Sequence, residues 1–184
     1  MKYGWFFTAV TVLCLTSCSP EKNDTPDKKP ADSAVLKPTP KLKNIISSAM
    51  AELLNALEAV ETWRVEDSET RKDNELPKRT AQGKTFGEVR AHAFAELLVD
   101  EKNYDFDSHK DAKPSFGVLW VLKSSKGNVE VYQCFLCGEW FVRAVDAKGK
   151  LITSYTLSND PARKQLLQWA KEGLPDDKVI QGVE

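Results

Sequence analysis

The chain contains few of the residues from which most catalytic and metal sites are built. Its 184 residues include two histidines and four cysteines. It also lacks the Gly-x-Ser-x-Gly pattern of serine hydrolases, the phosphate-binding loop and the dinucleotide-binding fingerprint. These absences favour a non-enzymatic protein, and we expect no cofactor.

An excess of positive charge is missing as well. Lysine and arginine number 26 against 27 aspartates and glutamates, which gives a net charge of −1. Nucleic-acid-binding domains usually carry a basic patch or stripe, so we expect no nucleic acid partner. No hydrophobic run is long enough to span a bilayer, since that takes about 20 residues and the run from Tyr3 to Leu15 has about 13.

The N-terminal residues are typical of an export signal. Lys2 and the apolar run after it have the charge and the length of a secretory signal peptide. The run ends in Leu15-Thr16-Ser17-Cys18, which resembles the cleavage site of bacterial lipoproteins. The resemblance implies that residues 1–17 are removed and that Cys18 is lipidated with acyl chains, palmitate among them.

The lipid would anchor the protein to a membrane of the bacterial cell envelope. Because Ser19 rather than aspartate follows the cysteine, the resemblance implies the outer membrane, facing the periplasm, if the host is Gram-negative. Residues 18–43 carry five of the nine prolines and mixed charges without apolar periodicity, so we expect a flexible tether. Residues 44–173 are expected to form a single α+β domain, and residues 174–184 a loose tail.

The first half of the domain is expected to be partly helical. Apolar residues at helical spacing predict a first helix from Asn44 to about Leu57. Residues 59–66 fit either a strand or a continuation of the helix. Residues 67–84 are charged and contain a proline and a glycine, so an exposed loop is expected there.

Two further helices have marked ends. The capping box Thr85–Glu88 predicts a helix from Phe86 to about Asp100. Asp160 and Pro161 begin the last helix, which Gly173 ends. The apolar stripe of the earlier helix is expected to consist of Val89, Ala93, Phe94 and Leu97.

Beyond residue 115 the apolar pattern changes to period two. Segments 116–123, 128–134, 139–145 and 150–156 predict four strands. Glycines lie in the first and last connections, where hairpins need positive φ. Consecutive strands with tight connections form a meander, so the sequence predicts an α+β fold with a four-stranded antiparallel meander packed against about three helices.

Cys134 and Cys137 are the pair able to carry chemistry, because the other two cysteines belong to the signal peptide and the lipid anchor. They occupy a predicted turn, and residues three apart in a turn are close enough for a disulfide. A structural disulfide or two packed thiols is one interpretation. The others are a thioredoxin-like redox pair, half of a zinc site completed by His92 and His109, and a nucleophilic cysteine with His109 as base.

One observation weighs against each of the chemical interpretations. A strand-like segment follows Cys137, so the helix dipole that activates redox cysteines is missing. A closed zinc site takes four ligands and the chain has no second cysteine pair, so we expect no metal. His92 lies four residues from both Glu88 and Glu96 and is expected to be exposed and ion-paired. His109 lies in an acidic segment that is expected to be a solvated loop.

Trp120, Tyr132 and Trp140 come from three neighbouring strands of the predicted meander. Core packing is one interpretation. An exposed binding patch on the sheet is the other, since tryptophan and tyrosine are enriched at binding hot spots. Because the cysteine turn separates Tyr132 from Trp140, the sequence leaves open whether the three share a face.

A second resemblance covers residues 86–173. Tyr104 and the turn Cys134-Phe135-Leu136-Cys137-Gly138 resemble those of an uncharacterised group of bacterial proteins. The resemblance implies a recurring domain and no particular mechanism. The sequence thus predicts a lipid-anchored lipoprotein whose non-enzymatic domain binds an envelope protein or another ligand. The alternative is a thiol-redox or metal-handling protein that acts through Cys134 and Cys137.

Overall fold

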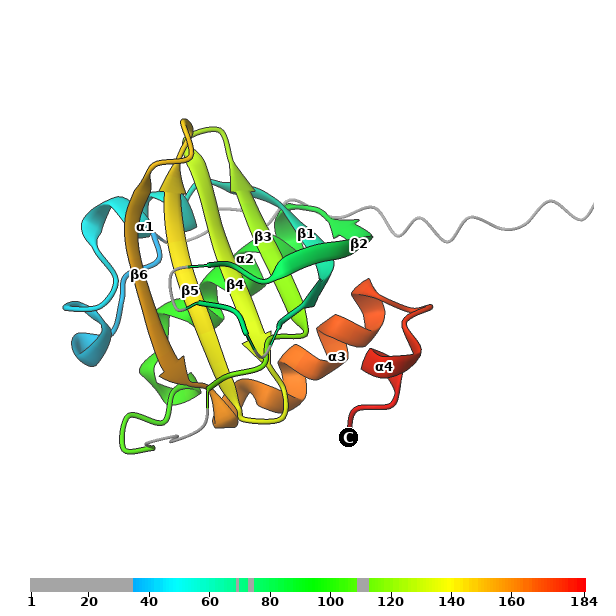
Figure 1. The fold of residues 1–184 in the computed structure, drawn as a ribbon. Helices are drawn as coiled ribbons and strands as arrows, with labels where there is room; N and C mark the ends of the chain where they lie inside the picture. Colours follow the sequence, from blue (N-terminus) through cyan, green and yellow to red (C-terminus); the bar gives the residue numbers. More distant parts are fainter. Residues whose placement is uncertain (1–34, 69, 73–74, 109–112) are drawn as a thin grey trace, which may run out of the picture.

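The computed structural model describes residues 35–68, 70–72, 75–108 and 113–184. Within these ranges, six strands form one antiparallel sheet, and helices pack against one of its faces (Figure 1). The strands are β1 (Leu57–Glu66), β2 (Lys78–Phe86), β3 (Val118–Ser124), β4 (Gly127–Cys134), β5 (Glu139–Asp146) and β6 (Leu151–Ser158). The helices are α1 (Ser48–Leu54), α2 (Glu88–Val99), α3 (Arg163–Gly173) and α4 (Lys178–Gln181), and the short 3-10 helices are η1 (Pro40–Leu42), η2 (Glu101–Asn103) and η3 (Asp160–Ala162).

The strand order is β2-β1-β3-β4-β5-β6, and every neighbouring pair is antiparallel. The α+β class and the meander of β3 to β6 agree with the sequence prediction, but the expected number of four strands is wrong because β1 and β2 extend the sheet. β2 occupies part of the expected loop. Its side chains are almost all exposed and do not alternate, so this strand depends on backbone hydrogen bonds to β1.

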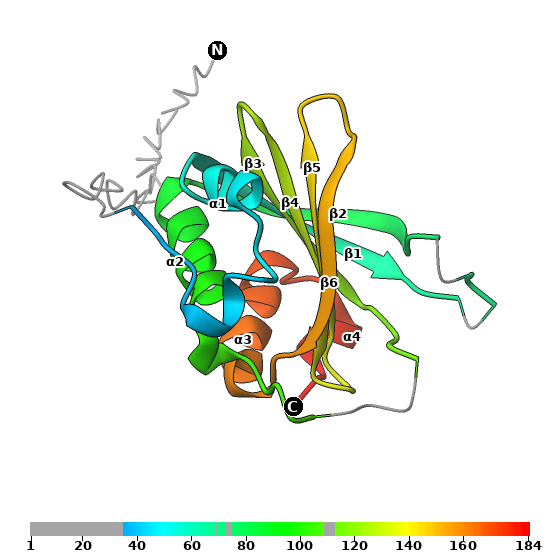
Figure 2. The ribbon, with the colours of Figure 1, turned by 90° about the vertical axis from the view of Figure 1, so that its left-hand side faces the viewer.

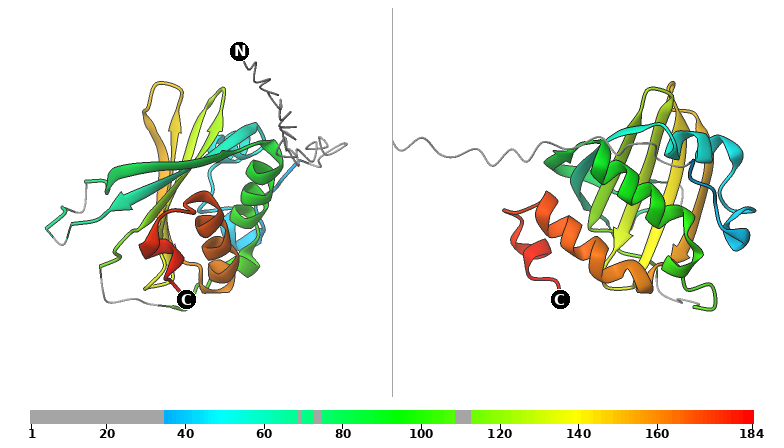
Figure 3. Two further views of the ribbon diagram at one scale, coloured as in Figure 1. Left: turned by 90° about the vertical axis from the view of Figure 1, so that its right-hand side faces the viewer. Right: turned by 180° about the vertical axis from the view of Figure 1, so that it is seen from behind.

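Alternation along the strands gives the sheet a covered face and an open face. On the covered face, Trp120, Val131 and Val142 lie side by side on β3, β4 and β5. The helices α1, α2 and α3 lie on this side, while the β1–β2 hairpin projects to the other side (Figure 2, Figure 3). Phe94 of α2 contacts Trp120 and also Trp169 of α3, with ring centroids 5.1 and 5.2 Å apart. Aromatic contacts therefore connect both helices to the sheet.

α2 begins two residues later than the capping box predicts. Phe86 is still paired in the sheet, and Gly87 is the N-cap without a side-chain hydrogen bond. The expected cap at Thr85 is therefore wrong, because this residue belongs to β2. Val89 is 43% exposed instead of facing the core, whereas Leu97 is buried as expected.

The chain before β1 packs more closely than the sequence predicts. α1 is shorter than the expected helix and starts after its capping residue Ser47. Leu42 is fully buried, and the backbone N–H of Thr39 donates a hydrogen bond to the carbonyl of Val99 at 2.9 Å. The last residues of the expected tether therefore belong to the folded domain. The predicted signal peptide and Cys18 lie outside the described residues.

The C-terminal segment also packs against the domain. Asp160 and Pro161 lie in η3, which precedes α3, and α3 ends as expected. Asp177 then caps α4 and forms an ion pair with Arg64 of β1 at 3.2 Å. Ile180 of α4 is buried. The expected loose tail is therefore wrong, because an apolar side chain and an ion pair hold this helix on the domain.

Candidate functional site

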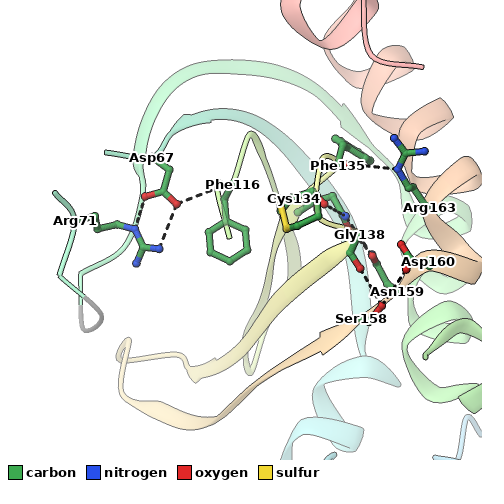
Figure 4. The surroundings of a disulfide bond; sticks show 12 residues. Asp67, Arg71, Phe116, Cys134, Phe135, Gly138, Ser158, Asn159, Asp160 and Arg163 are labelled. Atoms are coloured by element: carbon green, nitrogen blue, oxygen red, sulfur yellow. Dashed lines mark hydrogen bonds and ion pairs between the residues drawn. A yellow bond between two sulfur atoms is a disulfide. The ribbon is translucent and has the colours of Figure 1, made fainter. Parts of the chain in front are cut away.

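The turn between β4 and β5 holds the cysteine pair. Cys134 and Cys137 are joined by a disulfide, with Cα atoms 5.6 Å apart. Cys134 is buried and Cys137 is half-buried. The carbonyl of Gly138 accepts hydrogen bonds from the backbone N–H of Asn159 at 2.8 Å and from the hydroxyl of Ser158 at 3.3 Å (Figure 4). These bonds fasten the turn to the end of β6.

Gly138 is required at its position in this turn. Its φ of +65° lies in the left-handed region that favours glycine, and a Cβ atom would collide with the carboxylate of Asp160. On the other side of the turn, the Phe135 ring packs edge-on against Trp120 at 6.3 Å. The Phe135 carbonyl accepts a hydrogen bond from Arg163 Nε at 2.9 Å. The cysteine turn is therefore an integral part of the packed domain.

The surroundings of the disulfide differ from those of an activated redox site. β5 follows Cys137, so the N-terminus of a helix does not begin at the sulfur atoms. Among the described residues, no three His, Cys, Asp or Glu side chains are grouped so that they could hold a metal ion. His92 Nε2 lies 3.5 Å from Glu88 Oε1, as expected, although the histidine is half-buried rather than exposed. His109 lies outside the described residues. Redox activity of the pair stays a prediction.

The three candidate binding aromatics do not form an exposed patch. Trp120 and Trp140 face the helices, and Tyr132 points to the open face. Each residue is at most 1% exposed. Adjacent strand positions face opposite sides, and Tyr132 is the residue after Val131, which pairs with Trp120. The expected binding patch is therefore wrong, and the interpretation as core packing is confirmed.

The open face carries an aromatic cluster that the sequence analysis did not predict. Phe116, Tyr132 and Phe141 have ring centroids 5.9 to 6.4 Å apart. The backbone N–H of Phe116 donates to Asp67 Oδ2 at 3.2 Å, and Asp67 also binds the guanidinium of Arg71 (Figure 4). The same guanidinium lies 5.7 Å from the Phe116 ring. These contacts tie the chain after β1 to the aromatic cluster.

Glu130 of β4 is the centre of a charged group beside this cluster. Its carboxylate oxygens lie 2.8 Å from Arg79 Nη2 and 3.5 Å from Arg143 Nε, and one accepts a hydrogen bond from the Tyr132 hydroxyl at 3.3 Å. The two arginines offset the cost of burying this carboxylate. Burial, together with the negative charge of Glu130, raises the pKa of Tyr132 to about 12.

The β1–β2 hairpin curls over the open face to bring Arg79 to Glu130. In a flat sheet β2 and β4 would lie about 14 Å apart, which is too far for this contact. The pairing of β1 with β2 shifts register next to Trp63 and next to Val65, and such bulges bend a strand. The Arg79 guanidinium also lies 5.4 Å from the Trp63 ring. The curled hairpin closes one side of the open face.

A cavity of about 600 Å³ lies on the open face above β5 and β6. On its floor, Phe141 of β5 is opposite Thr156 of β6, and Arg143 is opposite Ser154. Along the strands these two pairs lie about 7 Å apart. Its walls are formed by the segments that precede β2 and β3, including Leu76. The floor places an aromatic ring, a guanidinium and two hydroxyls around one pocket that is open to solvent.

The sequence carried a signal for the floor of this cavity but not for its walls. Period-two alternation puts Phe141 and Arg143 on the same face of β5, which the sequence alone indicates. Most wall residues, among them Arg71, Leu76, Pro77 and Lys113, come from segments that the sequence predicts to be loop, and nothing local indicates which strands they approach. The cavity therefore depends on long-range packing.

Comparisons with protein-family models, curated proteins and solved structures found no match to this chain. No helix in the described ranges is long and apolar enough to cross a bilayer. Function is therefore inferred from the geometry of the cavity and of the cysteine turn.

Proposed function

We propose that this protein is a lipid-anchored envelope protein whose domain binds a small ligand on the open face of its sheet, without catalysing a reaction. The lipoprotein-like signal that ends at Cys18 supports the location. The observation that carries the binding function is the cavity of about 600 Å³ above β5 and β6. Sites for small molecules typically have volumes of about 300 to 1,000 Å³.

The construction of the cavity favours binding over catalysis. β5 pairs along its length with β4 and β6, so the floor is held in place before a ligand arrives. A preorganised site loses less entropy on binding. Among the described lining residues, no histidine or cysteine lies where it could activate the hydroxyl of Ser154.

A screen of soluble small molecules by ligand-observed NMR tests the binding function. The full chain is reconstituted in phosphatidylcholine nanodiscs, and empty discs are measured in parallel. Thr156→Trp fills the cavity from an exposed position on β6, and Thr85→Trp makes the same change at an exposed position on β2, outside the cavity. We expect ligands that bind the unchanged protein and the Thr85→Trp variant but not the Thr156→Trp variant. Ligands that bind all three equally would contradict the proposal.

The anchor is tested separately at Cys18. Because the cysteine would be both the cleavage signal and the acyl acceptor, Cys18→Ala should leave an unprocessed precursor. Mass spectrometry of the mature N-terminus should find an acylated cysteine in the unchanged protein. An unmodified N-terminus cut at another position would contradict the anchor.

A second candidate function is thiol exchange or metal handling through Cys134 and Cys137. The half-buried state of Cys137 favours it, since an attacking thiol needs access to a sulfur atom. Titration of the native protein with a thiol reagent, before and after exposure to glutathione, tests this function. A pair that glutathione reduces, or that reacts only after a chelator is added, would support it. A pair that stays oxidised would count against it.

A further inference from the structure

We infer that the ligand of this cavity is a small anion attached to an apolar group, with its negative end at Arg143 and its apolar part against Phe141. The inference rests on the proposed binding function and adds the chemical class of the ligand. It follows from three features: an incompletely used guanidinium in the lining, two guanidiniums around one carboxylate at the floor, and apolar side chains exposed at the rim.

Arg143 lines the cavity and has unused hydrogen-bond donors. Its Nε lies 3.5 Å from the Glu130 carboxylate but has no hydrogen-bond partner, and within the described chain its two terminal nitrogens donate no hydrogen bond. A guanidinium forms paired, charge-assisted hydrogen bonds with a carboxylate or a phosphate. Ser154 is directly opposite Arg143 on β6, so its hydroxyl can donate to the same acid group.

The charges around the cavity also favour an anion. Arg143 is the cation on the floor of the cavity, while the charge of Arg71 at the wall is offset by its ion pair with Asp67. Behind the floor, Glu130 is shared between Arg143 and Arg79, so that one carboxylate faces two guanidiniums. The excess of guanidinium charge around this carboxylate raises the local concentration of anions.

Apolar side chains next to this charge explain why the ligand should not be a bare anion. Phe141 and Phe116 line the cavity on the side away from Arg143. Leu76 and Leu151 also line the cavity, and their side chains are 42% and 51% exposed. Burying such surface against a ligand contributes about 25 cal/mol per Å². A ligand with an apolar group about 7 Å from its acid group would fit both parts of the floor.

The inference is tested with three matched probes: 3-phenylpropanoate, the neutral alcohol 3-phenylpropan-1-ol, and acetate. Dissociation constants are measured by NMR with the full chain in phosphatidylcholine nanodiscs. We expect 3-phenylpropanoate to bind at least about tenfold more tightly than either of the other probes, because it alone uses both the guanidinium and the aromatic floor.

Two variants separate direct contact from general electrostatics. Arg143→Gln removes the guanidinium that lines the cavity. Arg79→Gln removes the other guanidinium that binds Glu130, and Arg79 does not line the cavity. We expect Arg143→Gln to weaken 3-phenylpropanoate about tenfold or more, with the alcohol unchanged, and Arg79→Gln to weaken the acid by less than about threefold. Equal losses in both variants would overturn the placement of the anion at Arg143.

The remaining outcomes distinguish this inference from the proposed function. Equal affinity for the acid and the alcohol, abolished by Thr156→Trp, would overturn the charge preference and leave the binding function standing. Affinity that is unaffected by Thr156→Trp would overturn both. Repeating the titration in phosphatidylglycerol discs identifies the source of the anion: unchanged affinity supports a free small molecule, and competition by the discs supports a lipid headgroup of the same chemistry.

Discussion

The covered and the open face of the sheet are built from the same strands and differ in what lies on them. On the covered face, Phe94 of α2 contacts Trp120 and Tyr104 contacts Trp140, and both tryptophans are essentially inaccessible. On the open face, Phe141 is half-buried beside a charged group and a cavity. The comparison teaches that alternation selects the side of the sheet on which a residue lies, while the packing partner decides whether it stabilises the fold or remains available to a ligand.

The two faces also use polar groups differently. The covered face buries mainly apolar side chains, with the uncharged polar residues Thr62 and Gln133 among them, so its stability comes chiefly from burial of hydrophobic surface. The open face buries Glu130 and therefore needs Arg79 and Arg143 close to it. Substitutions on the first face should mainly change the free energy of unfolding, and substitutions on the second should mainly change binding.

The largest effect is expected at the centre of the covered face. Phe94→Ala should lower the free energy of unfolding by about 3–5 kcal/mol, because a fully buried ring that contacts Trp120 and Trp169 is lost. Denaturant titration followed by circular dichroism measures this. Val89→Ala on the same helix is the control and should cost less than about 0.5 kcal/mol, since Val89 is exposed. Similar values for both variants would mean that the covered side of α2 is misassigned.

An intermediate effect is expected at the disulfide, where Cys134 packs against the aromatic cluster of the open face. Replacing Cys134 and Cys137 together by serine should lower the free energy of unfolding by roughly 2 kcal/mol or less, because the bridge closes a very short loop. The same titration, with reduced unchanged protein as the control, checks the value. A variant that fails to fold would show that the turn contributes more than loop closure.

A smaller effect on stability is expected at the floor of the cavity. Phe141→Ala should cost about 1 kcal/mol, since the ring is half-buried. It should nevertheless weaken the binding of 3-phenylpropanoate, while Phe141→Leu retains most of the affinity because it keeps an apolar contact. Stability is measured by denaturation and affinity by NMR. A large loss of stability with unchanged affinity would remove the distinction between the two faces.

The smallest effect is expected at the outer edge of the helix layer. A hydrogen bond from Arg90 at 2.7 Å lowers the pKa of Glu172 below its ordinary value of 4.5. The carboxylate form is thus favoured in the folded state, so this stabilisation is present at neutral pH and is lost as the pH falls through the lowered pKa. Glu172→Gln should cost at most about 1 kcal/mol at pH 7, because the pair is partly exposed.

Thermal unfolding between pH 7 and pH 3 checks this dependence. The difference between Glu172→Gln and the unchanged protein should shrink as the pH falls below about 4.5. Glu52→Gln, at an exposed position on α1, is the control and should show no such convergence. A difference that stays constant with pH would mean that the ion pair does not contribute through its charge.

The elements that could be predicted from the sequence are those with local signals. The four strands of the meander follow from alternation and from glycines in their connections, and all four lie where expected within about two residues. β2 carries neither signal, because an exposed edge strand has no buried face to impose alternation. Leu42 and Ile180 could not be assigned to the core, since the few apolar residues around each do not continue long enough to give a period.

The candidate site divides in the same way. The spacing of Cys134 and Cys137 and the turn that contains them were enough to predict that a disulfide can form. The functional reading of Trp120, Tyr132 and Trp140 failed, because residue type does not reveal whether a helix or solvent lies above a strand. Phe141 and Arg143 became candidate binding residues only because segments far away in the chain form the walls of the cavity around them.

The sequence by itself determined the period of the four meander strands, their tight turns and which residues of one strand share a face, because these depend on neighbours a few residues apart. Only the tertiary structure decided which side the helices cover, that β2 joins the sheet, and that the hairpin curls until Arg79 reaches Glu130. These outcomes depend on contacts between residues separated by tens of positions. Such contacts bury apolar surface or pair opposite charges, and no local sequence pattern specifies which residues will meet.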